Sequence, residues 1–270
     1  MTENGDEQGL SWRNRLDRWL GRGTTPESHE HAGGVGGGLP TAYAVGDIHG
    51  RLDLLLRIED LIRRDIAIQG QSGTVLVFLG DYIDRGKDSR GVIEHLLNRP
   101  PLAETEIFLR GNHEQVMLDS LVTAATIESW AQFGGLETLV SYGLRPKLPL
   151  TAESCEVLRE KLADALPPSH LAFLRATRPS YETRSHFFAH AGVNPQVPLA
   201  QQRPADLMWI RDEFLASSRR FGKRVVHGHT PVPAPEVLPN RINVDTGAYM
   251  TGKLSCAVVS EGRCRILSTA

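Results

Sequence analysis

The apolar and polar positions between residues 41 and 270 alternate between short apolar runs and segments of helical periodicity. Residues 74–79 form an apolar run, as expected for a strand that is buried on both faces. Residues 52–68 instead repeat apolar side chains every three or four positions, which predicts an amphipathic helix. The same criteria predict helices over residues 89–97 and from about residue 114. They predict further strands over residues 43–45, 106–109, 186–189, 224–226, 241–244, 254–260 and 264–268.

The order of these elements predicts the fold class. Strand, helix, strand, helix and strand follow one another at the start of the region, which predicts an α/β fold whose parallel strands are covered by helices. Residues 115–180 are predicted to be mostly helical and precede a second group of strands. About 230 residues suffice to enclose a sizeable core. We therefore expect residues 41–270 to form one domain that carries a helical insertion at about 115–180.

Residues 1–40 have a different composition. Five of the seven residues in 32–38 are glycine, which predicts a flexible linker. Before this linker, residues 10–22 predict a short basic amphipathic helix. This helix could dock on a partner or associate peripherally with a membrane, or it could simply pack on the domain. Its apolar positions are Trp12, Leu16, Trp19 and Leu20.

The composition excludes several classes of protein. Lysine and arginine total 30 against 32 aspartates and glutamates, a net charge of -2, so we expect no nucleic-acid partner. No apolar run approaches the ~20 residues of a membrane-spanning helix. The start of the chain lacks the apolar core of a signal peptide, so the expected location is the cytoplasm. Three scattered cysteines predict neither a disulfide framework nor a thiolate metal site.

Five short polar segments stand at the ends of predicted strands, and each contains glycine. Ligands of such sheets bind beyond the carboxyl ends of the strands, and glycine lets the backbone turn sharply and approach a bound group. The five segments are therefore predicted to form one site. They are GDIHG (46–50), GDYIDRG (80–86), RGNHE (110–114), HAG (190–192) and HGHT (227–230).

The residue types in these segments suit divalent cations. Asp47 and His49 are two residues apart, so in an extended segment their side chains point the same way and could bind one cation. Asp81 has two carboxylate oxygens and could bridge two cations. The side chains that could complete a second cation are Asn112, His190 and His229.

This set of ligands also predicts a type of chemistry. Oxygen and imidazole ligands without thiolate favour Mn, Fe or Zn. Two such cations ~3.5–4 Å apart polarise phosphoryl oxygens and generate hydroxide near neutral pH. Taken singly, each motif is more often a surface turn, and a single histidine is more often a hydrogen-bonded core residue. The occurrence of all five segments at strand ends is what predicts hydrolysis at phosphorus.

GDIHG, GDYIDRG and RGNHE, in this order and spacing, resemble the motifs of the phosphoprotein phosphatase family of metallophosphoesterases. The resemblance covers roughly residues 41–250 and includes the HAG and HGHT segments. It implies a four-layer fold with a central β-sandwich of mixed sheets flanked by helices. It also implies two divalent metal ions, with Mn expected first and Fe or Zn as alternatives. The implied ligands are Asp47 and His49 for the first metal, Asp81 as the bridge, and Asn112, His190 and His229 for the second.

The resemblance further implies how catalysis proceeds. A hydroxide that bridges the metals would attack phosphorus, while His113 acts as the general acid for the leaving alkoxide and Asp84 orients His113. Arg85 and Arg211 are the implied phosphate-binding residues, and the planar fork of arginine suits that role. Supporting positions are expected at His227 and Asp245.

These motifs specify phosphoester hydrolysis and leave the substrate open. The leading prediction is dephosphorylation of phosphoserine and phosphothreonine in proteins or peptides, with phosphotyrosine as a further substrate. Glu114 favours it weakly, because similar protein phosphatases carry glutamate there and dinucleotide hydrolases typically carry aspartate. The alternatives are symmetrical hydrolysis of dinucleoside tetraphosphates and a non-catalytic scaffold. The scaffold is disfavoured because every expected ligand and His113 are present.

Residues 130–143 resemble a helical insertion of the bacterial members of this family. We expect this segment to border the active site and to shape access to it. Its large apolar side chains are predicted to pack the insertion on the core. They are Trp130, Phe133, Leu136 and Leu139.

Overall fold

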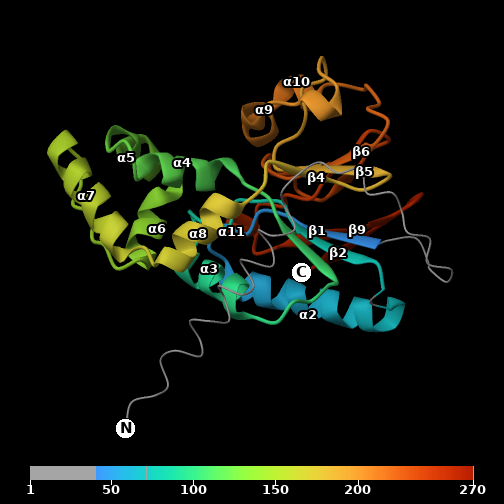
Figure 1. Cartoon of the computed structure of the whole chain (residues 1–270), viewed down its shortest axis with the longest axis horizontal. Coiled ribbons are helices and arrows are strands. Elements are labelled where there is room, and N and C mark those ends of the chain that lie inside the picture. Colours follow the sequence, from blue (N-terminus) through green and yellow to red (C-terminus); the bar gives the residue numbers. More distant parts are fainter. Residues whose placement is uncertain (1–40, 71, 270) are drawn as a thin grey trace, which may run out of the picture.

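Two five-stranded mixed sheets pack face to face, and helices cover their outer faces (Figure 1). The computed structural model describes residues 41–70 and 72–269, so the helix predicted over 10–22 and the linker predicted over 32–38 lie outside the described residues. The four layers are helices, first sheet, second sheet and helices. The predicted fold class is confirmed.

The first sheet has the strand order β10-β9-β1-β2-β3, in which β1, β2 and β3 are parallel. Thr41 lies opposite Thr74, and Val75 opposite Thr105, so the three strands end at one edge of the sheet. Helices α2 (Leu52–Gln69) and α3 (Ser89–Asn98) cover the outer face. The strands are β1 (Thr41–Val45), β2 (Thr74–Phe78), β3 (Thr105–Phe108), β9 (Ser255–Ser260) and β10 (Arg263–Ser268).

The second sheet has the order β4-β5-β6-β8-β7, with β5, β6 and β8 parallel. The two edge strands, β4 and β7, were not predicted, because they have three and two residues and are not fully buried. Short helices cover the outer face, and another precedes β9. The strands are β4 (Ser180–Glu182), β5 (His186–Ala189), β6 (Arg224–His227), β7 (Glu236–Val237) and β8 (Arg241–Asn243). The short helices are η2 (Leu199–Gln201), α9 (Pro204–Trp209), α10 (Asp212–Leu215) and α11 (Ala248–Thr251).

The packing of β2 explains its apolar run. Val77 faces the second sheet, where it joins a buried cluster that includes Phe188 and Ile242. Leu76 and Phe78 face the opposite way and pack under the helices of the outer layer. Both faces of the strand are therefore buried, and alternation with polar residues would place polar groups in a core.

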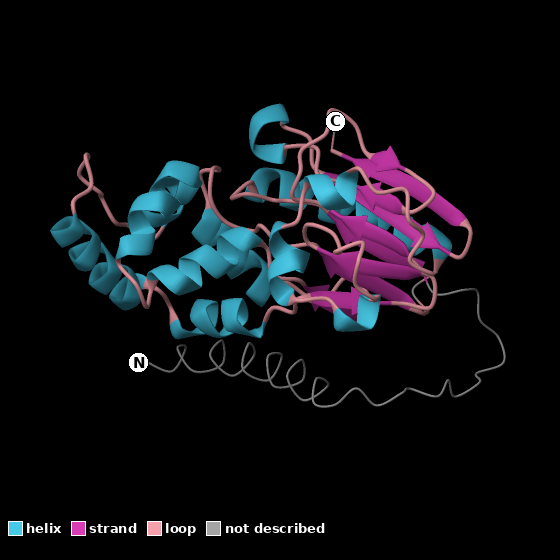
Figure 2. Cartoon of the chain, turned by 90° about the horizontal axis from the view of Figure 1, so that it is seen from above, coloured by secondary structure: helices cyan, strands magenta, loops and turns pink. Residues whose placement is uncertain are grey.

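A helical lobe stands beside the sandwich between β3 and β4 (Figure 2). The lobe includes most of residues 115–180, for which the sequence predicts mostly helix. Within it, Phe133 and Gly134 have non-helical backbone angles and kink the chain. None of the described helices is long and apolar enough to cross a bilayer. The helices of the lobe are α4 (Asn112–Ser120), α5 (Ala125–Trp130), η1 (Ala131–Gly135), α6 (Leu136–Ser141), α7 (Ala152–Ala165) and α8 (Pro168–Ala176).

Candidate active site

The five predicted segments meet at the carboxyl ends of the parallel strands of both sheets. The backbone N–H groups of Ile48 and His49 both donate to the Asp81 carbonyl, at 3.0 and 2.8 Å, and join the loops after β1 and β2. The loops of the second sheet are joined likewise, because Gly228 N–H donates to the His190 carbonyl at 2.8 Å. The five segments thus lie together in the structure, because residues from all of them belong to two groups that share Asp81.

Two glycines allow the loops after β2 and β3 to touch. Gly80 has a φ of 103°, a region that favours glycine. A Cβ atom at Gly80 would lie 2.5 Å from the backbone nitrogen of Gly111, and one at Gly111 would lie 2.0 Å from Oδ1 of Asp81. Any side chain at either position would push the two loops apart, so this part of the site depends on both glycines.

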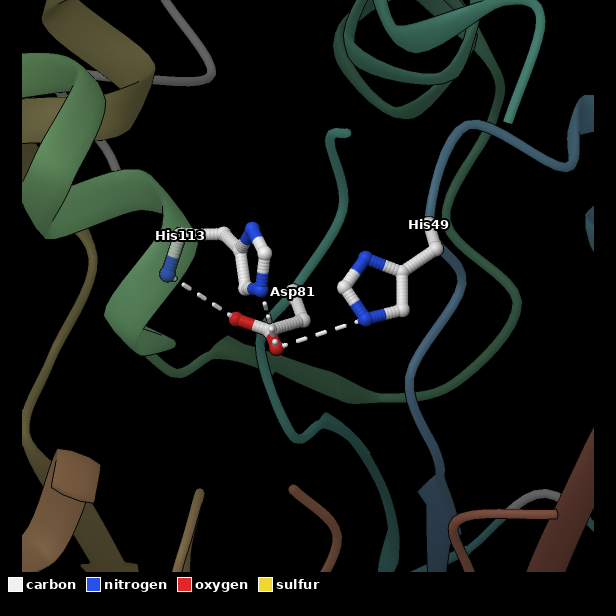
Figure 3. Close-up of side chains that lie close together, drawn as sticks. All are labelled: His49, Asp81 and His113. Atoms are coloured by element: carbon white, nitrogen blue, oxygen red, sulfur yellow. Dashed lines mark hydrogen bonds and ion pairs between the residues drawn. The ribbon is translucent and has the colours of Figure 1, made fainter. Parts of the chain in front are cut away.

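Asp81 lies at the centre of the site. Its Oδ2 atom is 3.5 Å from Nε2 of His49, 3.8 Å from Nε2 of His113 and 3.4 Å from Nε2 of His190. Figure 3 shows the first two contacts, with His113 at the start of α4 and His49 in the loop after β1. The carboxylate is buried. One oxygen therefore faces imidazoles from three separate segments of the chain, as a shared ligand of two cations would.

Possible ligand atoms form two groups around this carboxylate. In each group, one atom from each of three residues lies within 4.8 Å of the others. Asp81 belongs to both groups, which matches its predicted bridging position. The first group is His49, Asp81 and His113, and the second is Asp81, His190 and His229.

Two further predicted ligands lie beside the second group. Oδ1 of Asn112 is 2.9 Å from Nε2 of His190. Asp47 belongs to neither group among the described residues, and its carboxylate instead accepts the backbone N–H of His229 at 3.0 and 3.2 Å. The predicted role of Asp47 as a ligand of the first metal stays a prediction.

The backbone is strained where the site is built. The described part of the chain has five non-glycine residues with positive φ, and all five are predicted site residues. Such conformations cost about 1–3 kcal/mol each and persist only where the surroundings enforce them. The fold therefore maintains this arrangement against its local backbone preference. The residues are His49 (45°), Asp81 (50°), Asp84 (73°), Arg85 (65°) and His229 (66°).

The protonation of the histidines suits cation binding at two of them. Burial lowers the pKa of His49 to about 3 and that of His229 to about 2, so both imidazoles are neutral at pH 7. Burial also disfavours the charged form of His190, but Asp81 and Asp47 outweigh it and raise the pKa of His190 to about 9. His190 therefore holds a proton at pH 7 that a cation would have to displace.

The residues present fit a pair of divalent cations. Nε2 of His190 faces three other buried side-chain atoms, namely Oδ2 of Asp81 at 3.4 Å, Oδ1 of Asn112 at 2.9 Å and Nδ1 of His229 at 3.1 Å. Such convergence of oxygen and imidazole nitrogen atoms is the arrangement that a bound cation requires. The donors are oxygen and imidazole nitrogen, which suit Mn, Fe or Zn.

Cation binding is expected to release a proton from His190. Because the raised pKa keeps His190 protonated below about pH 9, the cation must displace that proton, and its affinity should rise with pH up to about pH 9. Calorimetric titration with Mn²⁺ at pH 7.5, in two buffers of different ionisation enthalpy, should show release of about one proton per chain. An apparent enthalpy that is the same in both buffers would contradict this assignment.

His113 and Asp84 form a buried pair next to Asp81. Nδ1 of His113 lies 2.6 Å from Oδ2 of Asp84, and Asp84 is completely buried. Burial acts to lower the pKa of His113, but the charge of Asp81 and the hydrogen bond to Asp84 outweigh it and leave that pKa above its ordinary value. The pairing fixes a proton on Nδ1 and leaves Nε2 facing the site.

Arg85 bridges the two histidines of the first group. Its guanidinium nitrogens lie 3.0 Å from Nε2 of His49 and 3.1 Å from Nε2 of His113. Because guanidinium only donates, both Nε2 atoms accept. The ring of Tyr249, 4.7 Å from the guanidinium carbon, covers the other side of Arg85. The guanidinium is thus held beside the first ligand group, and Arg85 is partly exposed, so an anion could reach it.

Arg211 borders the second group and is the more exposed of the two predicted phosphate-binding arginines. It donates to the carbonyl of His229 at 3.4 Å and to Oγ1 of Thr230 at 3.3 Å. The ring of the exposed Trp209 lies 6.4 Å from that of His229. The two arginines therefore approach the ligand cluster from different sides.

Glu114 has a structural role that the sequence did not reveal. Its buried carboxylate accepts the backbone N–H groups of Asp81 and Tyr82 at 2.8 Å and that of Gly111 at 2.9 Å. Its carboxylate therefore joins the loops after β2 and β3 through hydrogen bonds to both. Burial and the neighbouring charge of Asp81 raise the pKa of Glu114 to about 7. Because this side chain has no exposed surface, it does not contact substrate directly.

The two expected supporting residues lie against the site. Asp245 follows β8, and its carboxylate accepts the N–H of Gly247 at 2.8 Å. Burial raises the pKa of Asp245 to about 6, and burial together with the charge of Asp245 raises the pKa of Asp47 well above its ordinary value. His227 is buried at the end of β6, with its ring 5.0 Å from that of Phe214.

The insertion contributes contacts that sequence reasoning missed. Trp130 and Leu139 are buried as predicted, but the prediction that Phe133 packs on the core is wrong, because it lies at the kink with 66% of its surface exposed. Trp130 also donates to Asp84, and so does Thr138. A buried tryptophan usually has a hydrogen-bond partner for its N–H group, so the predicted burial of Trp130 could have indicated a polar partner such as Asp84.

Comparisons with known proteins agree with this geometry. A model of the calcineurin-like phosphoesterase family matches residues 41–256. Serine/threonine-protein phosphatase 1 of Salmonella typhimurium is 30% identical over 222 residues, which cover 80% of this chain and 90% of that protein. The asymmetrical bis(5'-nucleosyl)-tetraphosphatase PrpE of Halalkalibacterium halodurans is 25% identical over 227 residues, or 78% and 87% of the two chains. A crystal structure of a candidate diadenosine tetraphosphatase has a TM-score of 0.58 at 24% identity, covers 85% and 94% of the chains, and shows the likeness of fold.

Proposed function

The chain belongs to the calcineurin-like phosphoesterase family, and from this premise we propose that it dephosphorylates phosphoserine and phosphothreonine in proteins or peptides. As a member of this family it is a metallophosphoesterase, a hydrolase of phosphoesters. The observation that carries the proposal is the placement of the His113–Asp84 pair and Arg85 against the ligand groups around Asp81. This arrangement supplies the groups that hydrolysis of an alkyl phosphate requires.

The ligand groups would hold two divalent cations, which supply Lewis acidity toward phosphoryl oxygens and an activated water. Asp81 would bind both, His49 one of them, and His190 with His229 the other. Asp47 and Asn112 complete the proposed set. Arg85 and Arg211 would bind the remaining phosphoryl oxygens from two sides, because each guanidinium already lies beside one ligand group.

Nε2 of His113 would donate a proton to the leaving oxygen. Nδ1 is committed to Asp84, so Nε2 is the nitrogen that can carry the transferred proton. Arg85 occupies this nitrogen in the structure. A phosphate group that draws Arg85 toward itself would free Nε2 for that proton. Serine and threonine alkoxides are strongly basic leaving groups and need such an acid more than phenolates do.

The comparison with Salmonella serine/threonine-protein phosphatase 1 supports a phosphoprotein substrate, because the two chains are 30% identical over 80% of this chain and 90% of that protein. A second candidate function is hydrolysis of dinucleoside tetraphosphates, which the similarity to PrpE favours. That relative is named as an asymmetrical enzyme, whereas our sequence-based alternative was symmetrical cleavage. The third alternative, a non-catalytic scaffold, conflicts with the intact His113–Asp84 pair beside the clustered ligand residues.

A side-by-side assay separates these functions. With Mn²⁺ present, the protein should hydrolyse a phosphoserine peptide and 4-nitrophenyl phosphate, with kcat/KM for the peptide well above that for diadenosine tetraphosphate. The Asp81→Asn protein gives the background for each substrate. A preference for the dinucleotide by orders of magnitude would replace the proposal with the second candidate, and its products would distinguish symmetrical from asymmetrical cleavage. Inactivity on all three substrates would favour the scaffold.

A further inference from the structure

Asp84 receives its hydrogen bonds from a part of the chain that lies far from it in sequence. Oδ2 accepts from Nε1 of Trp130 at 2.7 Å as well as from His113, and Oδ1 accepts from Oγ1 of Thr138 at 2.6 Å. We propose that Trp130 and Thr138 are positioning residues for the acid pair, so that the insertion carrying α5 and α6 controls protonation of the leaving group. This inference rests on the proposed role of His113 as the acid.

The hydrogen bonds leave Asp84 little freedom to move. Asp84 and Thr138 have no exposed surface, and Trp130 has 1%. The three donors, from α4, α5 and α6, approach the carboxylate from different elements. If one is lost, a buried carboxylate oxygen is left short of a partner, and the carboxylate can turn away from His113. Protonation at Nε2 depends on the direction of that ring.

The same insertion also holds the backbone of the strained turn. Asp84 and Arg85 both have positive φ, which costs each of them energy. The N–H of Asp84 lies 2.9 Å from Oγ1 of Thr138, and the N–H of Arg85 donates to the carbonyl of Gly134 at 3.0 Å. Two consecutive strained residues are thus fixed by partners about fifty residues further along the chain. The orientation of the acid pair and that of Arg85 share one support.

The contact at Gly134 explains the kink in the insertion. Gly134 has a φ of 105°, and a Cβ atom there would lie 2.5 Å from Cγ of Arg85. The chain can bring its carbonyl to Arg85 only where it leaves helical geometry. Gly135 then packs on the Trp130 indole, where a Cβ atom would lie 2.6 Å from the ring. The break in the helix therefore serves both sets of contacts.

Two near-isosteric changes test the proposal. Trp130→Phe removes the indole N–H, and Thr138→Val removes the hydroxyl while preserving the shape. Each should lower kcat on a phosphoserine peptide by about 10-fold and kcat on 4-nitrophenyl phosphate by less than about 3-fold, with KM little changed, because only the alkoxide needs the acid. Thr138→Ser, which keeps the hydroxyl, should restore most of the loss on the peptide.

Leu139→Val provides the matched control. Leu139 is buried in the same helix as Thr138, and its replacement by valine makes a core side chain smaller without removing a hydrogen bond to Asp84. Loss of folded protein, as expected in Leu139→Val, lowers kcat on both substrates by the same factor. If Trp130→Phe and Thr138→Val also lower both kcat values by the same factor, the proposal is overturned. His113→Asn separates the two levels of the argument. If His113→Asn lowers kcat more on the peptide than on 4-nitrophenyl phosphate and the insertion variants do not, only the positioning role of Trp130 and Thr138 fails. If His113→Asn lowers both kcat values equally, the acid role of His113 fails, and the positioning role fails with it.

Discussion

Replacement of Asp81 by asparagine is expected to abolish cation binding and turnover together. Asp81 is shared by both groups of possible ligands, and no other described residue belongs to both. Asparagine offers one oxygen and no charge, and its amide N–H₂ would face three imidazoles. Bound metal should fall from two ions per chain to fewer than one, and kcat should fall by at least about 10³-fold because hydrolysis depends on the cations.

Elemental analysis of the dialysed protein and a phosphopeptide assay measure these two quantities. Asp88→Asn is the matched control, because Asp88 caps α3 through the N–H of Gly91 and asparagine is an equally good cap. The control should keep both metals and full activity. Retention of two metal ions per chain in Asp81→Asn would contradict the bridging role of Asp81.

Replacement of His113 by asparagine should preserve the metals but remove most turnover on alkyl esters. We expect kcat on a phosphoserine peptide to fall by about 10²–10⁴-fold, the usual contribution of a general acid, and kcat on 4-nitrophenyl phosphate to fall much less. The reason is that an alkoxide needs a proton as it leaves, whereas 4-nitrophenolate does not. The ratio of the two kcat values, with metal content measured alongside, reports the acid role separately from folding.

His95→Gln is the comparison for this experiment. His95 pairs with Glu59 between α3 and α2, away from the ligand groups, so its replacement should leave the ratio of kcat values unchanged. Equal losses of His113→Asn on both esters would remove the acid role. Loss of bound metal in that variant would instead assign His113 to the first ligand group, in which its Nε2 lies.

Much of the fold was predictable because the central strands of the sandwich are buried on both faces. The apolar run of β2 follows directly from that burial, and the periodicity of α2 follows from its single buried face. The location of the site was predictable for a related reason, since parallel strands deliver their following loops to one edge. The short edge strands β4 and β7 were not predictable, because two or three partly exposed residues carry no period.

The details of the site depend on contacts that no local pattern encodes. Trp130 lies 46 residues from Asp84 and Thr138 lies 54 residues from it, and the two residues stand on either side of the kink at Gly134. Glu114 is similar, since its neighbours in sequence give no sign that it accepts backbone N–H groups more than 30 residues away. Asp47 is a further example, because the motif gives no sign that its carboxylate accepts the backbone N–H of His229, and its role as a metal ligand stays a prediction.

The residues around Asp81 come from both halves of the sandwich. His49 and Asp81 follow strands of the first sheet, whereas His190 and His229 follow strands of the second. A ligand that binds the whole set therefore links the two sheets through their loops. Its binding free energy adds to the free energy that keeps the halves together, so occupancy of the site and resistance of the protein to unfolding are linked quantities.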